Sequence, residues 1–472
     1  MDFFVDRLRD FDENIALLQD NGKSVSYKEL AQYGEKVAPF VTTHSVAIIL
    51  CKNTLGSVIS YVSLLKNRVV PILLDAMIDR NLLDNLMHIY QPRYLCIPAE
   101  NRDEFPLYTK VLEWEDYLLL ENKDAEVYPV YEELAVLLTT SGSTGSPKFV
   151  RQSYRNIQAN TDSICEYLEL DENERAITTL PMNYTYGLSV LQSHMNVGAT
   201  ILLTDLPVVR KEFWDFAKRE KVTSLVGVAY TYEMYLRAKL MTMDLPSLKT
   251  MTQAGGKLPY NRHKEFSEFA QRAGIRFVVM YGQTEATARM SYLPYDKSIE
   301  KCGSIGIPIP GGQFELRDDD GNLITDVDVD GELVYRGDNV TLGYAECAAD
   351  LAKGDERHGV LKTGDIAKRD ADGYYYITGR KKRFVKIYGS RVNLDEVEQL
   401  IRNQFPQIEC ACVGNDTKLI LYINAENDVE ECERYLAKTT HINLAAIKVM
   451  YIDEIPKNES GKILYKNLET DL

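Results

Sequence analysis

No apolar run in this 472-residue chain is long enough to cross a membrane. The longest uncharged stretch, residues 176–204, contains Pro181 and several amide side chains, so it predicts buried strands and a loop. The first residues, MDFFVDRLRDFDEN, are interrupted by acidic side chains too often for a secretory leader. The sequence therefore predicts a protein without a membrane span, placed in the cytoplasm.

The cysteines lack the spacing of metal or redox sites. Of the eight, Cys410 and Cys412 lie two residues apart, the others are scattered, and no CxxC pair occurs. Reduced cysteines in the protein core are the simplest interpretation, and this interpretation agrees with the cytoplasm.

Positive charge is also scarce. The chain has 54 Lys and Arg against 70 Asp and Glu, a formal net charge of −16, which argues against binding nucleic acid through bulk charge. No internal repeat or low-complexity tract occurs. Because 472 residues are too many for one core, two or three domains are expected.

What the sequence does contain is a recurring strand–helix–strand pattern. Short apolar runs alternate with segments of helical spacing, which predicts parallel sheets with helices on both faces. Three such units cover residues 45–75, 199–228 and 247–282. Within them the predicted strands are 45–51, 69–75, 199–205, 222–228 and 275–282.

The pattern changes from about Gly303 onward. Short strands follow, with Asp-Gly pairs at 320–321 and 372–373 that indicate hairpins. A helix over 394–404, a strand over 419–425, another helix and a final strand then predict a small α+β unit. We expect an α/β protein with two domains. Residues 1–381 form layered mixed β-sheets and helices with a small β-rich subdomain, and 382–472 form a small mobile α+β domain.

The stretch LLTTSGSTGSPKFV, residues 137–150, places small polar residues between apolar ones. Small residues let backbone N–H groups point into a concave nest, and Lys148 adds positive charge, which suits phosphate oxygens. It is not the GxxxxGK[ST] loop of phosphate-transferring NTPases, because Pro147 precedes the lysine and no Ser or Thr follows it. A surface turn is the alternative for this stretch taken alone.

Six motifs together resemble the adenylate-forming superfamily, which includes acyl-CoA synthetases, adenylation domains of peptide synthetases and luciferases. They occur in that superfamily's order over nearly the whole chain, and the likeness is greatest to acyl-CoA or acyl-carrier-protein synthetases. The motifs are TTSGSTGSPK (139–148), YGQTEAT (281–287), GELVYRGDNVTLGY (331–344), LKTGD (361–365), GRKKRFVKIYGSRV (379–392) and IPKNESGKILYKNL (455–468).

The resemblance implies an enzyme with two half-reactions and a small domain that alternates between them. ATP first activates a carboxylic acid as an acyl-adenylate, with release of pyrophosphate. A thiol, of CoA or of the phosphopantetheine of an acyl carrier protein, then takes the acyl group. Mg²⁺ is the implied metal cofactor, because it prefers carboxylate oxygen and the phosphates of the nucleotide.

The resemblance also implies how the phosphates and the metal are held. Glu285 would hold Mg²⁺, and Thr284 would contact the α-phosphate. The loop that resembles the family's phosphate loop would hold the β- and γ-phosphates through Thr140, Ser141, Gly142, Ser143, Thr144, Gly145 and Lys148.

The base and the ribose have their own implied residues. Tyr281 would stack near adenine, with Gly282 beside it. Asp365 would accept hydrogen bonds from both ribose hydroxyls, and Arg380 would lie beside the nucleotide. Two glycines that follow a predicted strand would let adenine approach the backbone closely, namely Gly255 and Gly256.

Three lysines carry the implied chemistry of the small domain. Lys462 would bridge the substrate carboxylate and the α-phosphate during adenylation. Lys382 stands at the family's hinge position and would be the pivot between the half-reactions. Lys386 is a candidate contact in the second step.

The pocket for the acid departs from the commonest family patterns. Tyr184 stands where many acyl-CoA synthetases carry a histidine. Gly187 stands where the amino-acid-activating members place an aspartate, so an ammonium there would be buried without a partner. This favours an acid without an α-amino group. The implied substrate residues are Tyr184, Tyr186, Gly187, Val228 and Ala254. The pocket would also be lined by Gly227, Ala229, Tyr230, Arg289 and Met290.

Other functions stay open at this stage. The protein could be a stand-alone amino-acid adenylation enzyme, which the glycine at 187 argues against. It could be a catalytically inactive nucleotide-binding or scaffold protein, although Lys148, Glu285, Asp365 and Lys462 are all present. A kinase or phosphate-releasing ATPase is a third alternative.

Overall fold

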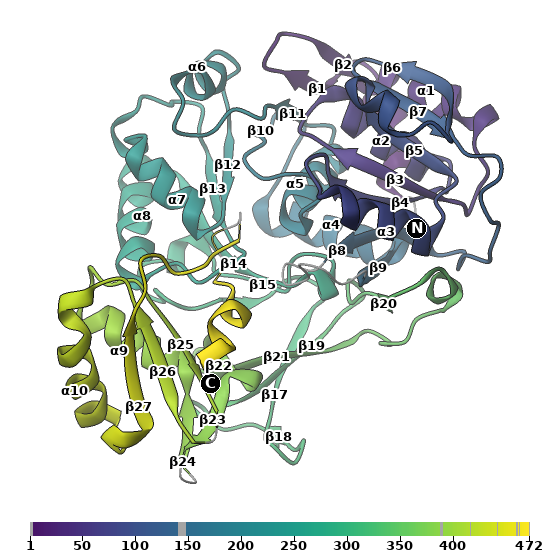
Figure 1. Ribbon diagram of the computed structural model, residues 1–472. Coiled ribbons are helices and arrows are strands. Elements are labelled where there is room, and N and C mark those ends of the chain that lie inside the picture. Colours follow the sequence, from purple (N-terminus) through teal and green to yellow (C-terminus); the bar gives the residue numbers. More distant parts are fainter. Residues whose placement is uncertain are drawn as a thin grey trace. The chain divides into compact units, whose positions relative to one another are not determined.

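The structure, a computed structural model, describes residues 3–139, 148–387, 390–415, 417–440, 442–458, 461 and 463–471 (Figure 1). Two compact units make up the chain. The first comprises Met1–Gln313 and Tyr335–Leu361, and the second comprises Phe314–Val334 and Lys362–Leu472. This division into two compact units does not show where the small domain pivots. The domain boundary at 381/382 therefore stays a prediction. Among the described residues, no helix is both long and apolar enough to cross a membrane.

An eight-stranded mixed sheet in the first unit carries the strand that precedes the Gly-, Ser- and Thr-rich sequence of residues 140–147. Its order is β20-β9-β8-β4-β3-β5-β7-β6, with β8, β4, β3 and β5 parallel to one another and the outer strands antiparallel. The strands are β3 (Val46–Cys51), β4 (Val70–Asp75), β5 (Tyr94–Pro98), β6 (Thr109–Trp114), β7 (Tyr117–Glu121), β8 (Leu134–Thr139), β9 (Phe149–Ser153) and β20 (Gly343–Ala345).

A nine-stranded sheet carries the strand that leads into the YGQTEAT motif. Its order is β16-β15-β14-β13-β12-β10-β11-β1-β2, and the run from β14 to β1 is parallel. The strands are β1 (Ile15–Gln19), β2 (Ser24–Ser26), β10 (Arg175–Ile177), β11 (Thr200–Leu203), β12 (Ser224–Gly227), β13 (Thr250–Gln253), β14 (Arg276–Tyr281), β15 (Ser291–Tyr292) and β16 (Ile307–Pro308).

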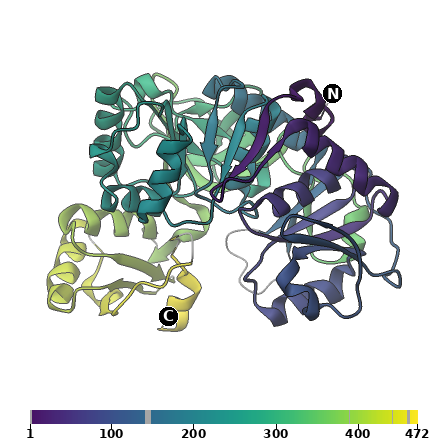
Figure 2. The same cartoon turned by 90° about the horizontal axis from the view of Figure 1, so that it is seen from above.

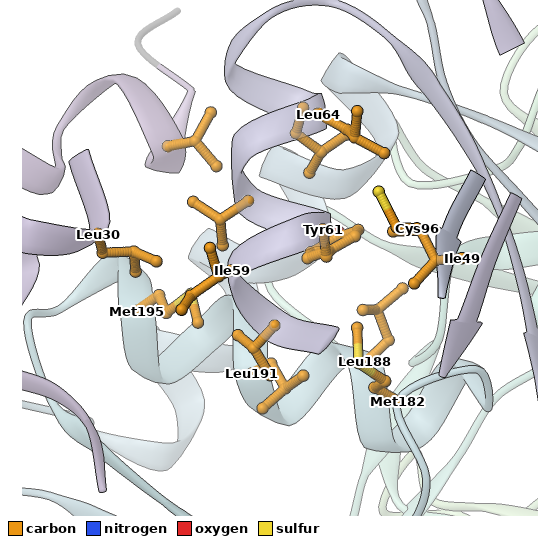
Figure 3. Packing of buried hydrophobic residues seen from close by; sticks show 14 of the residues in the cluster. Leu30, Ile49, Ile59, Tyr61, Leu64, Cys96, Met182, Leu188, Leu191 and Met195 are labelled. Atoms are coloured by element: carbon orange, nitrogen blue, oxygen red, sulfur yellow. The ribbon is translucent and has the colours of Figure 1, made fainter. Parts of the chain in front are cut away.

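Helices from both halves of this unit share one core between the two sheets. They are α1 (Tyr27–Val37), α2 (Leu55–Lys66), α4 (Tyr154–Leu168) and α5 (Thr185–Asn196). Figure 3 shows Ile59 and Tyr61 of α2 in this core, together with Leu30 of α1, Leu191 of α5 and Ile49 of β3. The residues are fully or almost fully buried, and this burial supplies the main free energy that stabilises the layers.

Other helices cover the outer faces of the two sheets (Figures 1 and 2). α3 (Arg80–Tyr90) packs on the eight-stranded sheet, and α6 (Lys211–Arg219), α7 (Ala229–Arg237) and α8 (Tyr260–Ala273) belong to the nine-stranded one. Tyr232 of α7 joins them to the sheet, since its ring lies 4.7 Å from Phe266 of α8 and 5.5 Å from Phe277 of β14. The predicted α/β class with mixed sheets is confirmed.

The prediction for residues 176–204 is wrong in its middle. Strands β10 and β11 are present, but the expected loop contains the twelve-residue helix α5. Every residue of α5 is buried. A helix that is buried all round shows no polar face, so its sequence lacks the 3.6-residue period that would reveal it.

The second unit combines a five-stranded sheet with a small α+β fold. The five-stranded order is β18-β17-β19-β21-β22, and β23 pairs with β24. The strands are β17 (Gln313–Arg317), β18 (Leu323–Ile324), β19 (Gly331–Arg336), β21 (Val360–Arg369), β22 (Tyr375–Arg380), β23 (Phe384–Ile387) and β24 (Ser390–Asn393). Both hairpins are confirmed, with Gly321 at φ +86° and Gly373 at φ +88°.

The last part of this unit is a three-stranded sheet with two helices on one face (Figure 2). β25 (Cys410–Gly414), β26 (Leu419–Ile423) and β27 (Ile447–Tyr451) pack against α9 (Leu394–Gln404) and α10 (Val429–Thr440). The sequence predicts all of these except β25. Its residues, CACVG, are small, and few of them have the β-branched or aromatic side chains that favour strands. Only the pairing with β26 reveals the strand.

Candidate active site

The carboxyl ends of three parallel strands meet at one edge of the nine-stranded sheet. β12, β13 and β14 are neighbours in register, and Gly227 pairs with Gln253 at this edge. Val228 follows β12, Gly255 and Gly256 follow β13, and the YGQTEAT motif begins at the end of β14. Ligands bind outside the carboxyl ends of parallel strands in open α/β sheets, so this edge is the candidate site.

The loop after β14 can exist only with glycine at 282. A Cβ atom on Gly282 would lie 1.7 Å from the carbonyl oxygen of Ala288, because the chain turns back on itself there. The 3-10 helix Thr284–Ala286 forms the turn, and Thr287 at its end has φ 67°. The Thr287 hydroxyl donates to the carbonyl of Asn339 at 2.7 Å and secures this conformation.

Glu285 is held at the turn by its backbone and by its side chain. Its carbonyl oxygen accepts hydrogen bonds from the Thr341 backbone at 3.1 Å and from Arg357 Nη1 at 3.0 Å. Its carboxylate Oε1 accepts one from the Tyr344 hydroxyl at 2.7 Å. The residue is half-buried. Protein contacts therefore fix its position, and it still reaches solvent.

Lys148 approaches the same tyrosine from the eight-stranded sheet. β20 pairs antiparallel with β9, with Tyr344 opposite Val150. The Lys148 ammonium lies 3.8 Å from the centre of the Tyr344 ring and 3.8 Å from Glu346 Oε1. Two predicted site residues, Lys148 and Glu285, are therefore brought together around Tyr344. Thr140, Ser141, Gly142, Ser143, Thr144 and Gly145 lie outside the described residues.

Tyr344 is a member of this cluster that the predicted site residues did not include. Burial raises the pKa of its hydroxyl to about 12, and the Glu285 charge adds to the rise. The hydroxyl therefore stays protonated at neutral pH and donates to the carboxylate. The sequence places Tyr344 at the end of a quoted motif, but its contact with Glu285 depends on the pairing of β20 with β9.

The residues around Glu285 suit a hard divalent cation with phosphate ligands. Among the described residues, no group of three or more His, Cys, Asp or Glu side chains is arranged to hold a metal alone. Mg²⁺ commonly takes one or two carboxylates from protein and the remainder of its ligands from phosphates and water. A single oriented carboxylate beside an ammonium group fits that mode.

Removing the Tyr344 hydroxyl should weaken the response to magnesium without removing the site. In Tyr344→Phe the aromatic ring still faces Lys148, but Glu285 loses its donor. We expect the Mg²⁺ concentration for half-maximal ATP–pyrophosphate exchange to rise about 10-fold. The control is Tyr376→Phe, which removes a 3.3 Å hydrogen bond to Asp370 and should leave that concentration unchanged. Equal behaviour of the two variants would contradict the role given to Tyr344.

The predicted acid-pocket residues form a second cluster at the same edge. Tyr184, Tyr186, Val228 and Ala254 belong to one group of packed side chains. Gly255 has φ +78°, and a Cβ atom there would lie 2.4 Å from the Tyr184 hydroxyl, so the glycine leaves room for that hydroxyl. The Tyr186 hydroxyl is hydrogen-bonded to Thr252 at 2.8 Å.

Two of the predicted glycines have different surroundings. A Cβ atom on Gly256 would meet nothing within 4 Å, so this position is open. A Cβ atom on Gly187 would lie 2.3 Å from the carbonyl oxygen of Pro181. A side chain at 187 would therefore point at the backbone of the preceding loop, and an aspartate would require that loop to move.

Asp365 and Arg380 meet within the second unit. They are opposite each other in the β21–β22 ladder, and Arg380 Nε lies 3.3 Å from Asp365 Oδ1. Asp365 is buried and Arg380 is exposed. Lys382 belongs to the 3-10 helix Lys381–Arg383, and Lys386 to β23, but their side chains and all of Lys462 lie outside the described residues.

In this unit a buried carboxylate contacts residues from two of the motifs. Glu398 of α9 lies 2.6 Å from Arg383 Nη2 and 2.9 Å from Arg402 Nη2. It also accepts hydrogen bonds from the Cys412 backbone at 2.8 Å and the Tyr465 hydroxyl at 3.1 Å. The Arg383 guanidinium lies 3.7 Å from the Tyr465 ring centre. Arg383 follows the predicted hinge by one residue, and Tyr465 follows Lys462 by three.

Comparison with known proteins agrees with this fold. The fold defines an α/β class of protein whose ligand-binding edge lies at the carboxyl ends of its parallel strands. Residues 4–345 match the family described as AMP-binding enzyme. The chain belongs to the AMP-binding enzyme family.

Two curated relatives and one solved structure illustrate the likeness. The chain is 30% identical to a long-chain-fatty-acid–CoA ligase of Yersinia pestis over 72% of its own length, and it spans 62% of that protein. It is 26% identical to a 2-succinylbenzoate–CoA ligase of Bacillus cytotoxicus over 97% of its length and 94% of the relative. The AMP complex of O-succinylbenzoate CoA synthetase (MenE) from Bacillus subtilis superposes with a TM-score of 0.81 at 22% identity, covering 99% of this chain and 98% of that one.

Proposed function

We propose that this enzyme is an ATP-dependent acid–thiol ligase of the acyl-CoA synthetase type. It activates a carboxylic acid as an acyl-adenylate, releases pyrophosphate, and transfers the acyl group to CoA. The observation that carries the proposal is the meeting of Lys148 and Glu285 around Tyr344, in a chain of the AMP-binding enzyme family. The two curated relatives named above are both CoA ligases, which supports CoA as the acceptor.

The first half-reaction requires two anions to meet. A carboxylate oxygen of the acid attacks the α-phosphorus of ATP, and the bond to the β-phosphate breaks with its electron pair leaving on pyrophosphate. Lys148 neutralises phosphate charge beside the loop of residues 140–145, and Lys462 bridges the carboxylate and the α-phosphate. Thr284, at the first position of the turn, contacts the α-phosphate.

The remaining nucleotide contacts involve residues at the ends of β13 and β14 and two carboxylates, Asp365 and Glu285. Tyr281 and Gly282 lie beside adenine, and Gly255 and Gly256 let it approach the chain. Asp365 accepts from the ribose hydroxyls, and Arg380, already 3.3 Å from that carboxylate, orients it. Glu285 would hold Mg²⁺, which supplies charge neutralisation on the phosphates when it is bound.

The second half-reaction uses the small domain in a second orientation. The chain pivots at Lys382, withdraws Lys462 and presents Lys386 toward the thiol. An acyl carrier protein is a second candidate acceptor, but a net charge of −16 disfavours an acidic carrier unless a basic patch such as 381–383 receives it. The eight cysteines are all unpaired, which supports a cytoplasmic location.

An amino acid is disfavoured as substrate. An α-ammonium would need a carboxylate partner, and position 187 offers neither a side chain nor room for one in the present backbone. Tyr184 supplies a hydroxyl where many acyl-CoA synthetases carry a histidine.

ATP–pyrophosphate exchange tests the proposal. The enzyme is given Mg²⁺, ATP and labelled pyrophosphate with fatty, aryl, short-chain, dicarboxylic and amino acids in turn. We expect exchange that depends on one class of acid without an α-amino group, and AMP with thioester when CoA is added. Formation of ADP or phosphate, activation of amino acids in preference to plain acids, or tight ATP binding without exchange would each contradict the proposal.

A further inference from the structure

Arg289 differs from every other buried charged side chain that the structure describes. Four of the five such groups contact an opposite charge, in the pairs Arg151–Glu356, Glu174–Lys249, Asp365–Arg380 and Glu398–Arg383. Arg289 is 2% exposed, and it has no ion pair with any carboxylate in the described ranges. A guanidinium remains charged at all accessible pH values, so this charge is buried without compensation.

The contacts of Arg289 are all with neutral groups. Nη1 donates to the Tyr167 hydroxyl at 3.0 Å and to Met280 Sδ at 2.9 Å, and Nη2 donates to Ser189 Oγ at 3.1 Å. The guanidinium carbon lies 4.7 Å from the centre of the Tyr186 ring. Nε is buried and has no hydrogen-bond acceptor. These contacts fix the orientation of the side chain, but neither a hydroxyl nor an aromatic face cancels a full charge.

The guanidinium lies among the residues of the acid pocket. Tyr186, against which it stacks, packs with Tyr184, Val228 and Ala254 at the carboxyl ends of the strands. Its electrostatic effect reaches further into the cluster. Burial raises the pKa of Tyr184, and the positive charge of Arg289 opposes that rise. The charge therefore acts on the place where the acid would bind.

We propose that Arg289 binds a second carboxylate of the substrate, so that the preferred acids are dicarboxylic. This inference rests on the proposed function, because it concerns the same pocket. The reacting carboxylate meets ATP, and the distal one meets the guanidinium. Planar N–H groups suit a carboxylate, and an anion there supplies the missing counter-ion. Substrate binding thus completes an ion pair whose cationic half is already oriented.

The exchange assay can test this preference directly with matched pairs of acids. The probes are linear and aromatic dicarboxylic acids of increasing length, each compared with its monomethyl ester, which differs by one methyl group and has one charge fewer. For at least one pair, we expect kcat/KM of the wild-type enzyme to favour the diacid by about 10- to 100-fold, the range for a buried charge-assisted contact. Arg289→Met should abolish this preference, and Arg289→Lys should retain part of it.

A measurement of thermal unfolding separates substrate recognition from a structural role. Removing an uncompensated buried charge in favour of a side chain of similar length should leave the unfolding temperature of Arg289→Met unchanged or higher. Arg151→Met is the matched control, because that arginine is equally buried but paired with Glu356. It should lower the unfolding temperature and keep the preference for diacids.

Each outcome decides between the two proposals. Equal use of diacids and monoesters by the wild-type enzyme overturns the role of Arg289 while the ligase function stands. Loss of folding in both Arg289 variants with no diacid preference in the wild type has the same meaning. If no acid supports exchange, the ligase function fails. In that case the inference stands only if dicarboxylates with AMP raise the unfolding temperature of the wild type and not of Arg289→Met.

Discussion

Glu285→Gln should reduce ATP–pyrophosphate exchange by about 10²- to 10³-fold. Glutamine keeps the size of the side chain and can still accept from the Tyr344 hydroxyl, which lies 2.7 Å from Oε1 in the native enzyme. What it removes is the negative charge that Mg²⁺ requires. The loop should stay intact, because the contacts that hold it are made by the carbonyl oxygen of Glu285 with Thr341 and Arg357.

The measurement is exchange as a function of Mg²⁺ concentration, with thermal unfolding as the check on folding. Higher Mg²⁺ should restore part of the activity if the defect is in metal binding. Glu346→Gln is the control, since this carboxylate lies 3.8 Å from Lys148 but is 67% exposed. It should change exchange by no more than a few-fold. Equal losses in the two variants would show that general negative charge near Lys148 matters, and that Glu285 has no special role.

Lys462→Ala should abolish one half-reaction and spare the other. We expect exchange to fall by about 10²- to 10³-fold, because in the proposed mechanism Lys462 supplies the positive charge that brings carboxylate and α-phosphate together. Thioester formation from a synthetic acyl-adenylate and CoA should continue at close to the native rate, since Lys462 is withdrawn in that step of the proposed cycle. The two rates are measured separately on the same preparation.

A neighbouring lysine provides the comparison for this variant. Lys457 lies in the same motif and pairs with Glu409 at 2.6 Å on the surface. Lys457→Ala should leave both half-reactions nearly unchanged, because exposed ion pairs contribute little. If Lys462→Ala slowed both half-reactions equally, the assignment of this lysine to adenylation alone would be wrong.

Local pattern was enough to predict several elements of the fold. The strand expected at 45–51 is Val46–Cys51, and the helix expected at 394–404 is Leu394–Gln404. The strand is a short continuous apolar run, and the helix has its buried residues at helical spacing, so pattern and tertiary structure agree. The pattern did not reveal α5, which is buried on every side, or β25, which has small residues and depends on its neighbour for pairing.

The candidate site divides in the same physical way. Lys148 and Glu285 stand in contiguous motifs, so the sequence names them before any contact is known. The bond between Tyr344 and Glu285 joins residues 59 positions apart, and it requires β20 to pair with β9 in one register. The missing counter-ion of Arg289 is even harder to predict from the sequence, since it follows from the positions of all nearby side chains in space.

The carboxylate of Glu398 has a mechanical consequence for the small domain. Its contacts clamp Arg383, one residue beyond the predicted pivot, to Tyr465, three residues beyond Lys462. Because Glu398 contacts both residues, a rotation at Lys382 in the proposed cycle would carry Arg383 and Tyr465 together. The enzyme would then need no separate conformational change to bring Lys462 into the site or to withdraw it. A single rotation at Lys382 would change the enzyme from one half-reaction to the other. Weakening the contacts of Glu398 would make the two half-reactions less strictly alternating, and every substrate contact would stay in place.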